Sequence, residues 1–228
     1  MTSIRAVFFD VDFTLIYPGP TFQAEGYRAF CARHGLAADP ARFDEAVAAA
    51  SVVLDEAQDH AYDPQIFIDY TSRVIEGMGG SGPTIRACAQ EMYDEWAGNQ
   101  HFFLYDEVPD VLASLRRAGL RIGLISNSHR CLASFQSHFE LEGLISAAIS
   151  SAEHGYMKPH PSIFEAALKV VDVSPPEAMM VGDSLAQDIE GARRLGMRGV
   201  LVARSGLVEA PVDGVPVIRS LRELEALL

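Results

Sequence analysis

The chain has 228 residues, of which 49% are hydrophobic and 21% charged, a composition typical of a globular protein with a sizeable core. Its formal net charge of −13 argues against nucleic acids and anionic membranes as partners, because both would repel it. No apolar stretch reaches the roughly 20 residues of a membrane helix, and the N-terminus lacks the features of a signal peptide. The three cysteines form no CxxC pair, which favours reduced thiols, so we expect a soluble, cytoplasmic protein.

An apolar segment at 4–9 predicts a buried strand that ends at Asp10. Beyond residue 104, apolar segments of strand length alternate with segments of helical period. The expected strands lie at 121–125, 144–150, 178–181, 199–202 and 215–218, and the expected helices at 108–118, 129–139, 162–171, 185–195 and 221–227. This alternation predicts an α/β fold, a Rossmann-like parallel sheet flanked by helices, with ligands at the carboxyl ends of its strands.

The segment at 17–104 interrupts this alternation and shows no strand pattern. Helix patterns separated by glycine or proline turns cover 21–34, 40–59, 64–78 and 83–97. We therefore predict an inserted all-helical domain at 17–104, and a core domain made of 1–16 and 105–228.

Polar side chains follow the expected strands of the core. They are Asp10 and Asp12 after the first strand, Ser126 and Asn127 after the second, Lys158 before the helix at 162–171, and Asp183 and Asp188 after the strand at 178–181. Because parallel strands end at one edge, these carboxylates would meet there and raise one another's pKa unless a cation joined them. An all-oxygen ligand set suits Mg²⁺ better than zinc.

This set resembles the four signature motifs of the haloacid dehalogenase superfamily, in the family's order. The matching segments are Asp10-x-Asp12-x-Thr14, then Ser126, then Lys158, then Gly182-Asp183-x4-Asp188. The helical insert lies where the family's C1-type cap lies. The chain departs from the pattern at Phe13, where relatives often have glycine, and we expect Phe13 to shape the floor of the site without abolishing activity.

The resemblance implies a Mg²⁺-dependent phosphatase that acts on a small phosphorylated metabolite. Asp10 would be the nucleophile that forms an aspartyl-phosphate. Asp12 would protonate the leaving group and then activate the hydrolytic water. The metal would be held by Asp10, Asp183 and the backbone carbonyl of Asp12.

The remaining motif residues have supporting roles in this interpretation. Lys158 would supply positive charge beside Asp10 and the transferred group. Ser126 and the backbone amide of Asn127 would donate hydrogen bonds to the phosphoryl oxygens. Thr14 would order the turn after the first strand, and Asp188 would hold Lys158 or a metal-bound water.

Other functions stay open at this point. A 2-haloacid dehalogenase would use the same nucleophile but has no need of Asp12, whereas a sugar phosphomutase keeps it. A non-catalytic module that binds phosphorylated metabolites would need neither a nucleophile nor an acid. Phosphonate cleavage in the family needs a cap lysine, and the insert has none. The sequence carries no signal for an oligomeric state.

Three histidines lie near the motifs, namely His129, His154 and His160. Their spacing matches no metal-ligand pattern, so we expect ordinary surface or turn histidines.

The insert is strongly acidic. Residues 16–104 contain 13 Asp and Glu against 5 Arg and no Lys. Few cationic groups are therefore present to hold a second anionic group of a substrate. We predict a preference for monophosphates whose leaving group is neutral or cationic.

Overall fold

The computed structural model describes residues 3–55, 59–204 and 214–228. The chain divides into two compact units, one made of Met1–Tyr17 with Leu104–Leu228 and the other of Pro18–Phe103. We call them the core unit and the helical unit and describe each by itself. No helix among the described residues has the length and hydropathy needed to cross a membrane.

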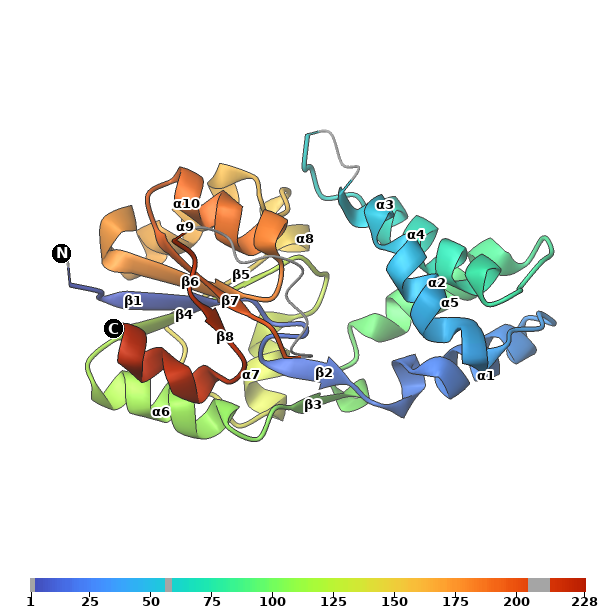
Figure 1. Cartoon of the computed structure of the whole chain (residues 1–228), viewed down its shortest axis with the longest axis horizontal. Helices are drawn as coiled ribbons and strands as arrows, with labels where there is room; N and C mark the ends of the chain where they lie inside the picture. The colour runs from blue at the N-terminus through green and yellow to red at the C-terminus, as the bar shows by residue number, and fades with distance from the viewer. Residues whose placement is uncertain (1–2, 56–58, 205–213) are drawn as a thin grey trace. The chain divides into compact units, whose positions relative to one another are not determined.

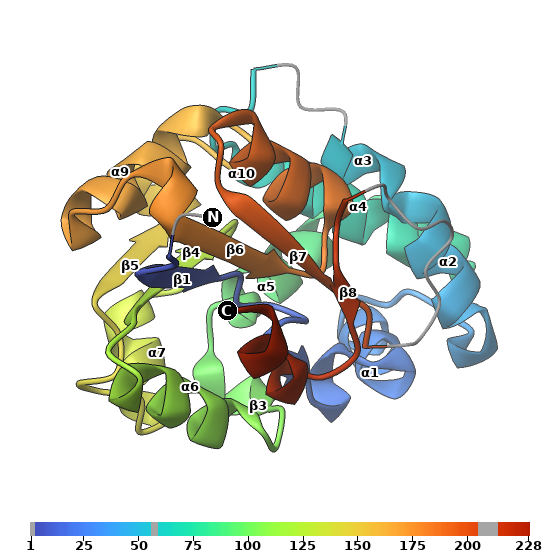
Figure 2. The same ribbon diagram turned by 60° about the vertical axis from the view of Figure 1, so that its left-hand side comes forward.

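The core unit is built on a six-stranded sheet in which every neighbouring pair is parallel (Figures 1 and 2). Its strands, in spatial order, are β5 (Ala147–Ser150), β4 (Arg121–Ser126), β1 (Ala6–Phe9), β6 (Ala178–Gly182), β7 (Arg198–Val202) and β8 (Val217–Ile218). This confirms the α/β fold with a parallel sheet that the alternation of strands and helices predicted.

The order in which successive strands are added to the sheet reverses at β1. It moves from β1 through β4 to β5 on one side, and then returns to β6, β7 and β8 on the other. Phe9 is in register with Leu124 of β4 and with Val181 of β6, so these three strands end at nearly the same level. Such a reversal point is where open α/β sheets bind ligands.

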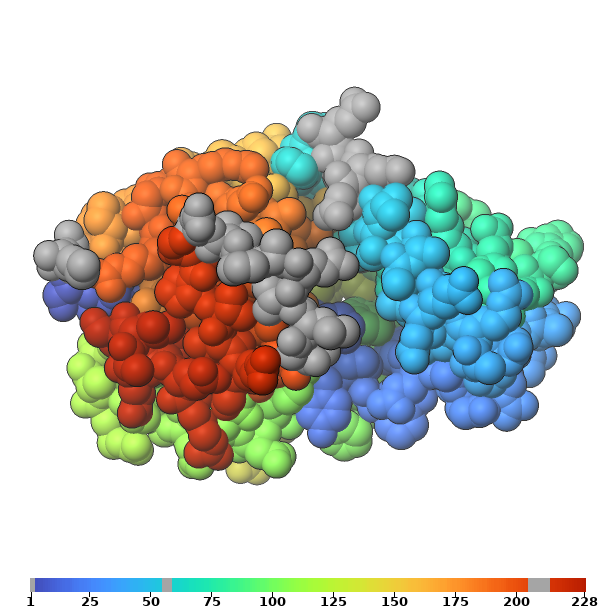
Figure 3. Space-filling model, viewed as in Figure 1, coloured from blue at the N-terminus to red at the C-terminus, as the bar shows by residue number. Residues whose placement is uncertain are grey.

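Helices cover both faces of the sheet. α9 (Pro161–Val171) and α10 (Gly191–Arg194) lie on one face, and α6 (Val108–Arg117) and α7 (Leu132–His138) on the other (Figure 2). The C-terminal 3₁₀ segment Leu221–Leu227 lies beside α6, as the space-filling view also shows (Figure 3). The Ser114 hydroxyl of α6 donates to Glu225 of that segment over 2.7 Å.

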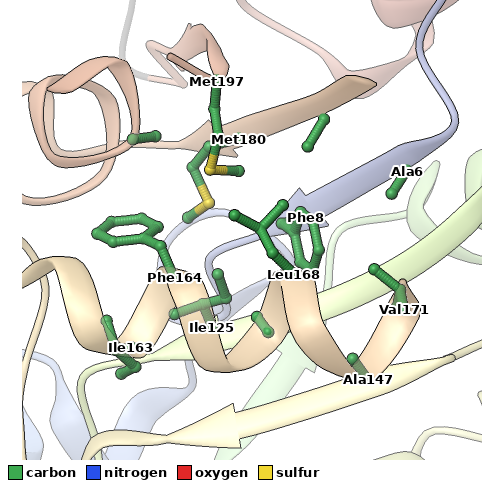
Figure 4. Close-up of a cluster of buried hydrophobic side chains, with 13 residues drawn as sticks. Ala6, Phe8, Ile125, Ala147, Ile163, Phe164, Leu168, Val171, Met180 and Met197 are labelled. Atoms are coloured by element: carbon green, nitrogen blue, oxygen red, sulfur yellow. The ribbon is translucent and has the colours of Figure 1, made fainter. Parts of the chain in front are cut away.

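A hydrophobic cluster fixes the central strands against α9 (Figure 4). Phe8, Ile125 and Met180 come from β1, β4 and β6, and they meet Phe164 and Leu168 of α9. Burying a side chain of this size contributes about 1.5–3 kcal/mol. The strands whose ends carry the predicted site are thus held by this buried cluster.

Several local predictions for the core unit were wrong. The helix expected at 129–139 begins at Leu132, because the residues before it form a hydrogen-bonded loop. The segment expected as one helix at 185–195 begins as a π-helix, Leu185–Glu190, before α10. The final helix is 3₁₀, and the short helix α8 (Ser151–His154) was not expected.

The helical unit contains five α-helices among its described residues. They are α1 (Ala24–Arg33), α2 (Phe43–Ala50), α3 (Val52–Asp55), α4 (Pro64–Gly77) and α5 (Ile85–Trp96). The helix expected at 40–59 is divided, with a 3₁₀ turn at Pro40–Arg42, α2 and α3; its residues 56–58 lie outside the described part.

The residues at the start of α4 stabilise its N-terminal end. Asp63 accepts a hydrogen bond from the Gln65 amide, and Pro64 occupies the first turn, where its missing N–H costs nothing. Val74 and Ile75 are buried on its inner face, and Cys88 and Met92 are buried on α5, which packs beside it.

Two short strands lie where the chain passes between the units. β2 (Ile16–Pro18) pairs with β3 (Phe102–Leu104), which corrects the expectation that this stretch contains no strand. Strands of three residues are too short to show an alternating pattern.

Candidate active site

The carboxyl ends of three adjacent strands bring the predicted residues together. Asp10 directly follows β1, and its amide donates to Val181 O of β6 over 2.9 Å. Ser126 is the last residue of β4, and Asp183 directly follows β6. The strand register therefore places side chains from distant parts of the sequence at one edge.

Lys158 lies between two of these carboxylates. Its Nζ atom is 2.5 Å from Asp10 Oδ1 and 2.6 Å from Asp188 Oδ1, and only 3% of the residue is exposed. Burial by itself would lower the pKa of Lys158, but the charges of Asp10 and Asp188 outweigh it and raise that pKa above its usual value. Lys158 is therefore a fixed cation beside Asp10.

The side chain of Asn127 holds the backbone of Lys158. Asn127 Oδ1 accepts from the Lys158 amide over 2.7 Å, and Asn127 Nδ2 donates to Lys158 O over 3.0 Å. The same Nδ2 atom donates to Gln187 Oε1 over 3.0 Å. The motif indicates a role for the backbone amide of Asn127 only, whereas its side chain holds the backbone of Lys158.

Three carboxylates form a cluster that can hold a cation. One oxygen each of Asp10, Asp183 and Asp188 lies within 4.8 Å of the others. Burial, with the charges of Asp10 and Asp188, raises the pKa of Asp183 well above its usual value. Burial also raises the pKa of Asp188 to about 6, against the opposing charge of Lys158. Such mutual repulsion is what a bound divalent cation relieves, and the oxygen donors fit Mg²⁺.

Asp188 is itself anchored. Its Oδ2 atom accepts from the Ser184 amide over 3.1 Å, while Oδ1 faces Lys158. Asp188 thus lies beside Lys158, and its carboxylate also belongs to the acidic cluster.

Asp12 has a partner that none of the motifs predicts. Arg130 Nη2 donates to Asp12 Oδ1 over 3.1 Å. Burial raises the pKa of Asp12, and the positive charge of Arg130 opposes that rise. Arg130 belongs to none of the recognised motifs and lies in a stretch that was expected to be helical, so no sequence signal pointed to it.

Ser126 lies buried beside the same loop. Its hydroxyl is 2.8 Å from the Ser128 hydroxyl, and both residues are less than 5% exposed. The loop after β4 thus has an internal hydrogen bond at the point where the motif predicts a phosphoryl-binding residue.

The turn after β1 has an unusual backbone. Phe13 has φ of 64°, a left-handed conformation that costs a residue other than glycine about 1–2 kcal/mol. Glycine would adopt this conformation without that cost. The Phe13 residue is 44% exposed. Thr14 is fully buried, and its carbonyl accepts from Arg204 Nη2 over 2.6 Å.

Two of the three histidines near the motifs share one contact. His154 Nε2 and His160 Nδ1 each lie 2.8 Å from the Ser162 hydroxyl, at the start of α9. No histidine takes part in the acidic cluster of described residues.

Comparison with known proteins agrees with the motifs. The haloacid dehalogenase-like hydrolase family profile matches residues 4–196. The phosphoserine phosphatase of Thermus thermophilus is 35% identical over 159 residues, which are 66% of this chain and 60% of that protein. The glyceraldehyde 3-phosphate phosphatase of Pyrococcus furiosus is 28% identical over 88% of this chain and 81% of its own. Human N-acylneuraminate-9-phosphatase is 29% identical over 100% of this chain and 95% of its own.

Solved structures share the fold. The HAD-hydrolase YfnB from Bacillus subtilis has a TM-score of 0.77 at 17% identity and covers 99% of both chains. A 2-haloacid dehalogenase from Pseudomonas syringae has a TM-score of 0.65 at 24% identity and covers 98% of this chain and 97% of its own. The family profile spans most of the sequence and the fold agrees with it, so this chain belongs to the haloacid dehalogenase-like hydrolases.

Proposed function

We propose that this hydrolase is a Mg²⁺-dependent phosphatase that cleaves a small phosphomonoester through an aspartyl-phosphate on Asp10. The observation that carries the proposal is the arrangement around Asp10, with Lys158 at 2.5 Å and Asp12 two residues further along the same loop. The enzyme is a phosphoric monoester hydrolase, which the names of three relatives support, since each is a phosphatase.

In the first step, a carboxylate oxygen of Asp10 attacks phosphorus and the bond from phosphorus to the leaving oxygen breaks. Asp12 gives its proton to that oxygen, so an alcohol leaves instead of an alkoxide. Lys158 keeps the Asp10 carboxylate in place and balances the negative charge that gathers there. Ser126 and the Asn127 amide donate hydrogen bonds to the phosphoryl oxygens.

In the second step, water attacks the phosphorus of the aspartyl-phosphate. Asp12, now ionised, accepts a proton from that water, and the bond between Asp10 and phosphorus breaks to release inorganic phosphate. Both carboxylates return to their starting protonation states. Splitting hydrolysis into two steps lets one carboxylate act twice, first as acid and then as base.

Mg²⁺, when bound, supplies positive charge that neutralises the phosphoryl group. Asp10, Asp183 and the backbone carbonyl of Asp12 would hold it, and Asp188 supports the site through Lys158. Thr14 keeps the loop after β1 in place through its bond to Arg204.

The domain assignment belongs to the proposal. The helical unit, Pro18–Phe103, acts as the cap that selects the substrate, and the core unit performs the chemistry. The substrate is a small phosphorylated metabolite, a class that includes the compounds in the relatives' names.

Release of phosphate from p-nitrophenyl phosphate tests the proposal. Asp10→Asn should abolish turnover, because an amide cannot attack phosphorus. Asp110→Asn, on the exposed start of α6, should leave turnover unchanged. EDTA should stop the reaction and added Mg²⁺ restore it, and Ca²⁺ should replace Mg²⁺ poorly. Full activity in EDTA, or in the Asp10→Asn protein, would contradict the mechanism.

Assays with other substrates separate the alternatives. A haloacid dehalogenase would release halide from 2-chloropropionate and leave the phosphate ester intact. A phosphomutase would transfer the phosphoryl group between positions of a sugar phosphate. A binding module would retain the phosphate ester without turnover. Asp12 argues against the dehalogenase, since the carbon–halogen bond breaks without a proton donor.

A further inference from the structure

Arg130 has the largest of the fully buried side chains among the described residues. It lies in the loop between β4 and α7, and its side chain has no exposed area. Removing a guanidinium from water is costly, so a buried arginine is kept where a carboxylate compensates its charge. A carboxylate that pairs with Arg130 therefore indicates a role for this side chain.

Asp12 provides that carboxylate. Arg130 Nη2 donates to Asp12 Oδ1 over 3.1 Å, although the two residues are 118 positions apart in the sequence. The side chain of Asp12 is 17% exposed and that of Arg130 is not exposed. A molecule that enters from solvent can reach Asp12, whereas Arg130 acts on Asp12 from the protein side.

Both partners lie in loops that follow paired strands. The Arg130 amide donates to the Ser128 hydroxyl over 3.4 Å, and that hydroxyl lies 2.8 Å from the Ser126 hydroxyl at the end of β4. Asp12 follows β1, which is paired in register with β4. The hydrogen bond from Arg130 to Asp12 therefore joins the loops that follow two neighbouring strands.

A carboxylic acid that serves as general acid has to present its proton toward the leaving oxygen. Positioned proton transfer of this kind contributes about 10²–10⁴-fold to a rate. With Oδ1 of Asp12 engaged by Arg130, we expect the proton transfer to fall to Oδ2. An arginine suits this role because it keeps all its protons at any pH that the enzyme meets.

We infer that Arg130 is a positioning residue for the acid–base step, which orients the carboxylate of Asp12 toward the leaving oxygen of the substrate. The inference rests on the proposed phosphatase function. It adds no covalent step, since the proton still moves from Asp12 to the leaving oxygen as the phosphorus–oxygen bond breaks.

Leaving-group dependence tests this role. We would measure kcat/KM with glycerol 2-phosphate, whose alkoxide needs a proton, and with p-nitrophenyl phosphate, whose phenolate leaves without one. Arg130→Met should lower kcat/KM about 100-fold or more with glycerol 2-phosphate and less than about tenfold with p-nitrophenyl phosphate. Arg130→Lys should fall between this variant and the unmodified enzyme, because lysine keeps the charge but not the planar donor geometry.

The double variant separates action through Asp12 from action on the substrate. Asp12→Asn should shift the ratio of the two kcat/KM values in the same direction as Arg130→Met. If Arg130 works through Asp12, adding Arg130→Met to Asp12→Asn should not change that ratio further. Arg121→Met is the control, since the Arg121 side chain makes a hydrogen bond within the core unit, to Asp172 O over 3.0 Å, but lies outside the site. Its ratio should equal that of the unmodified enzyme.

Equal losses with both substrates, a loss confined to KM, or additive effects in the double variant would overturn the inference. Circular dichroism and thermal unfolding show which variants fold. If Arg130→Met does not fold, Arg130→Lys decides, and an unchanged ratio in that variant contradicts the positioning role. An unmodified enzyme without Mg²⁺-dependent turnover would contradict the proposed function instead, so the two failures are distinguishable.

Discussion

The carboxylate of Asp188 lies directly against the backbone of Gly182. A Cβ atom at Gly182 would stand 2.2 Å from Asp188 Oδ2, far inside van der Waals contact. Gly182 ends β6, and Asp188 pairs with Lys158 at 2.6 Å. The absence of a side chain at one position is therefore what lets Asp188 reach Lys158, and through it the nucleophile.

Gly182→Ala should impair catalysis more than folding. The new methyl group would displace Asp188 and with it the ammonium group of Lys158, and a displacement of 1 Å in a catalytic group can cost about 100-fold in rate. We expect a loss of this size in kcat with p-nitrophenyl phosphate, measured at a temperature where the variant is folded.

The control for this variant is Gly123→Ala in β4. A Cβ atom there would stand 2.3 Å from the ring of Phe8, a comparable clash in the hydrophobic core. Gly123→Ala should lower the melting temperature and leave kcat of the folded fraction nearly unchanged. Similar kcat values for both variants would argue against the role given to Gly182.

Glu107 should make stability depend on pH. Burial by itself would raise the pKa of Glu107, but its ion pair with Arg204 and its bonds to backbone amides lower that pKa below the usual 4.5. In the folded state the group binds its proton less readily than in the unfolded state. Its contribution to the free energy of unfolding is therefore complete above pH 4.5 and is lost as the pH falls through the folded-state pKa.

Urea unfolding at a series of pH values between 7 and 3 would measure this contribution. Glu107→Gln should be less stable than the unmodified protein at pH 7, and the difference should shrink as the pH falls. Glu142→Gln, at an exposed position, should show no such convergence. A difference between Glu107→Gln and the unmodified protein that stays constant with pH would contradict the assignment.

The charge of the helical unit should limit the substrates. Three of its five arginines already pair with carboxylates of the same unit, in the pairs Arg28–Glu25, Arg33–Glu91 and Arg86–Asp69. Few cations are left to bind a second anionic group. Sugar or polyol monophosphates should exceed fructose 1,6-bisphosphate and nucleoside triphosphates in kcat/KM by about tenfold or more, a difference of about 1.4 kcal/mol.

A panel of phosphorylated metabolites, assayed by phosphate release at a fixed Mg²⁺ concentration, would test this preference. Repeating the panel at higher ionic strength gives the control, since salt should reduce a difference that arises from surface charge. A bisphosphate or nucleotide that clearly exceeds every ester with a neutral leaving group would contradict the prediction.

The fold was predictable from the sequence because its signals are local. Apolar strands that alternate with amphipathic helices specify a parallel sheet whichever residues later meet across it. The site residues could be predicted to lie together, because the carboxyl ends of parallel strands share one edge. β2 and β3 were missed because three residues carry too little periodicity.

The contacts that complete the site were not predictable in this way. Arg130 meets Asp12 across 118 positions, and Asn127 meets Lys158 across 31, in loops whose paths are set by tertiary packing. No spacing rule links such residues. The helix expected over 129–139 would even have placed Arg130 inside a regular element, whereas the loop that replaces its first residues is what turns Arg130 toward Asp12.

Covalent trapping at Asp10 tests the central claim most directly. Borohydride reduces an acyl phosphate, so quenching the enzyme with borohydride during turnover of p-nitrophenyl phosphate would convert a phosphorylated aspartate to homoserine. Mass spectrometry of the peptide that contains Asp10 should detect homoserine at this position only when substrate and Mg²⁺ are both present, and more of it in Asp12→Asn, where the phosphoenzyme loses its general base. Sustained turnover with no reduction at Asp10, or with homoserine at another aspartate, would contradict the account.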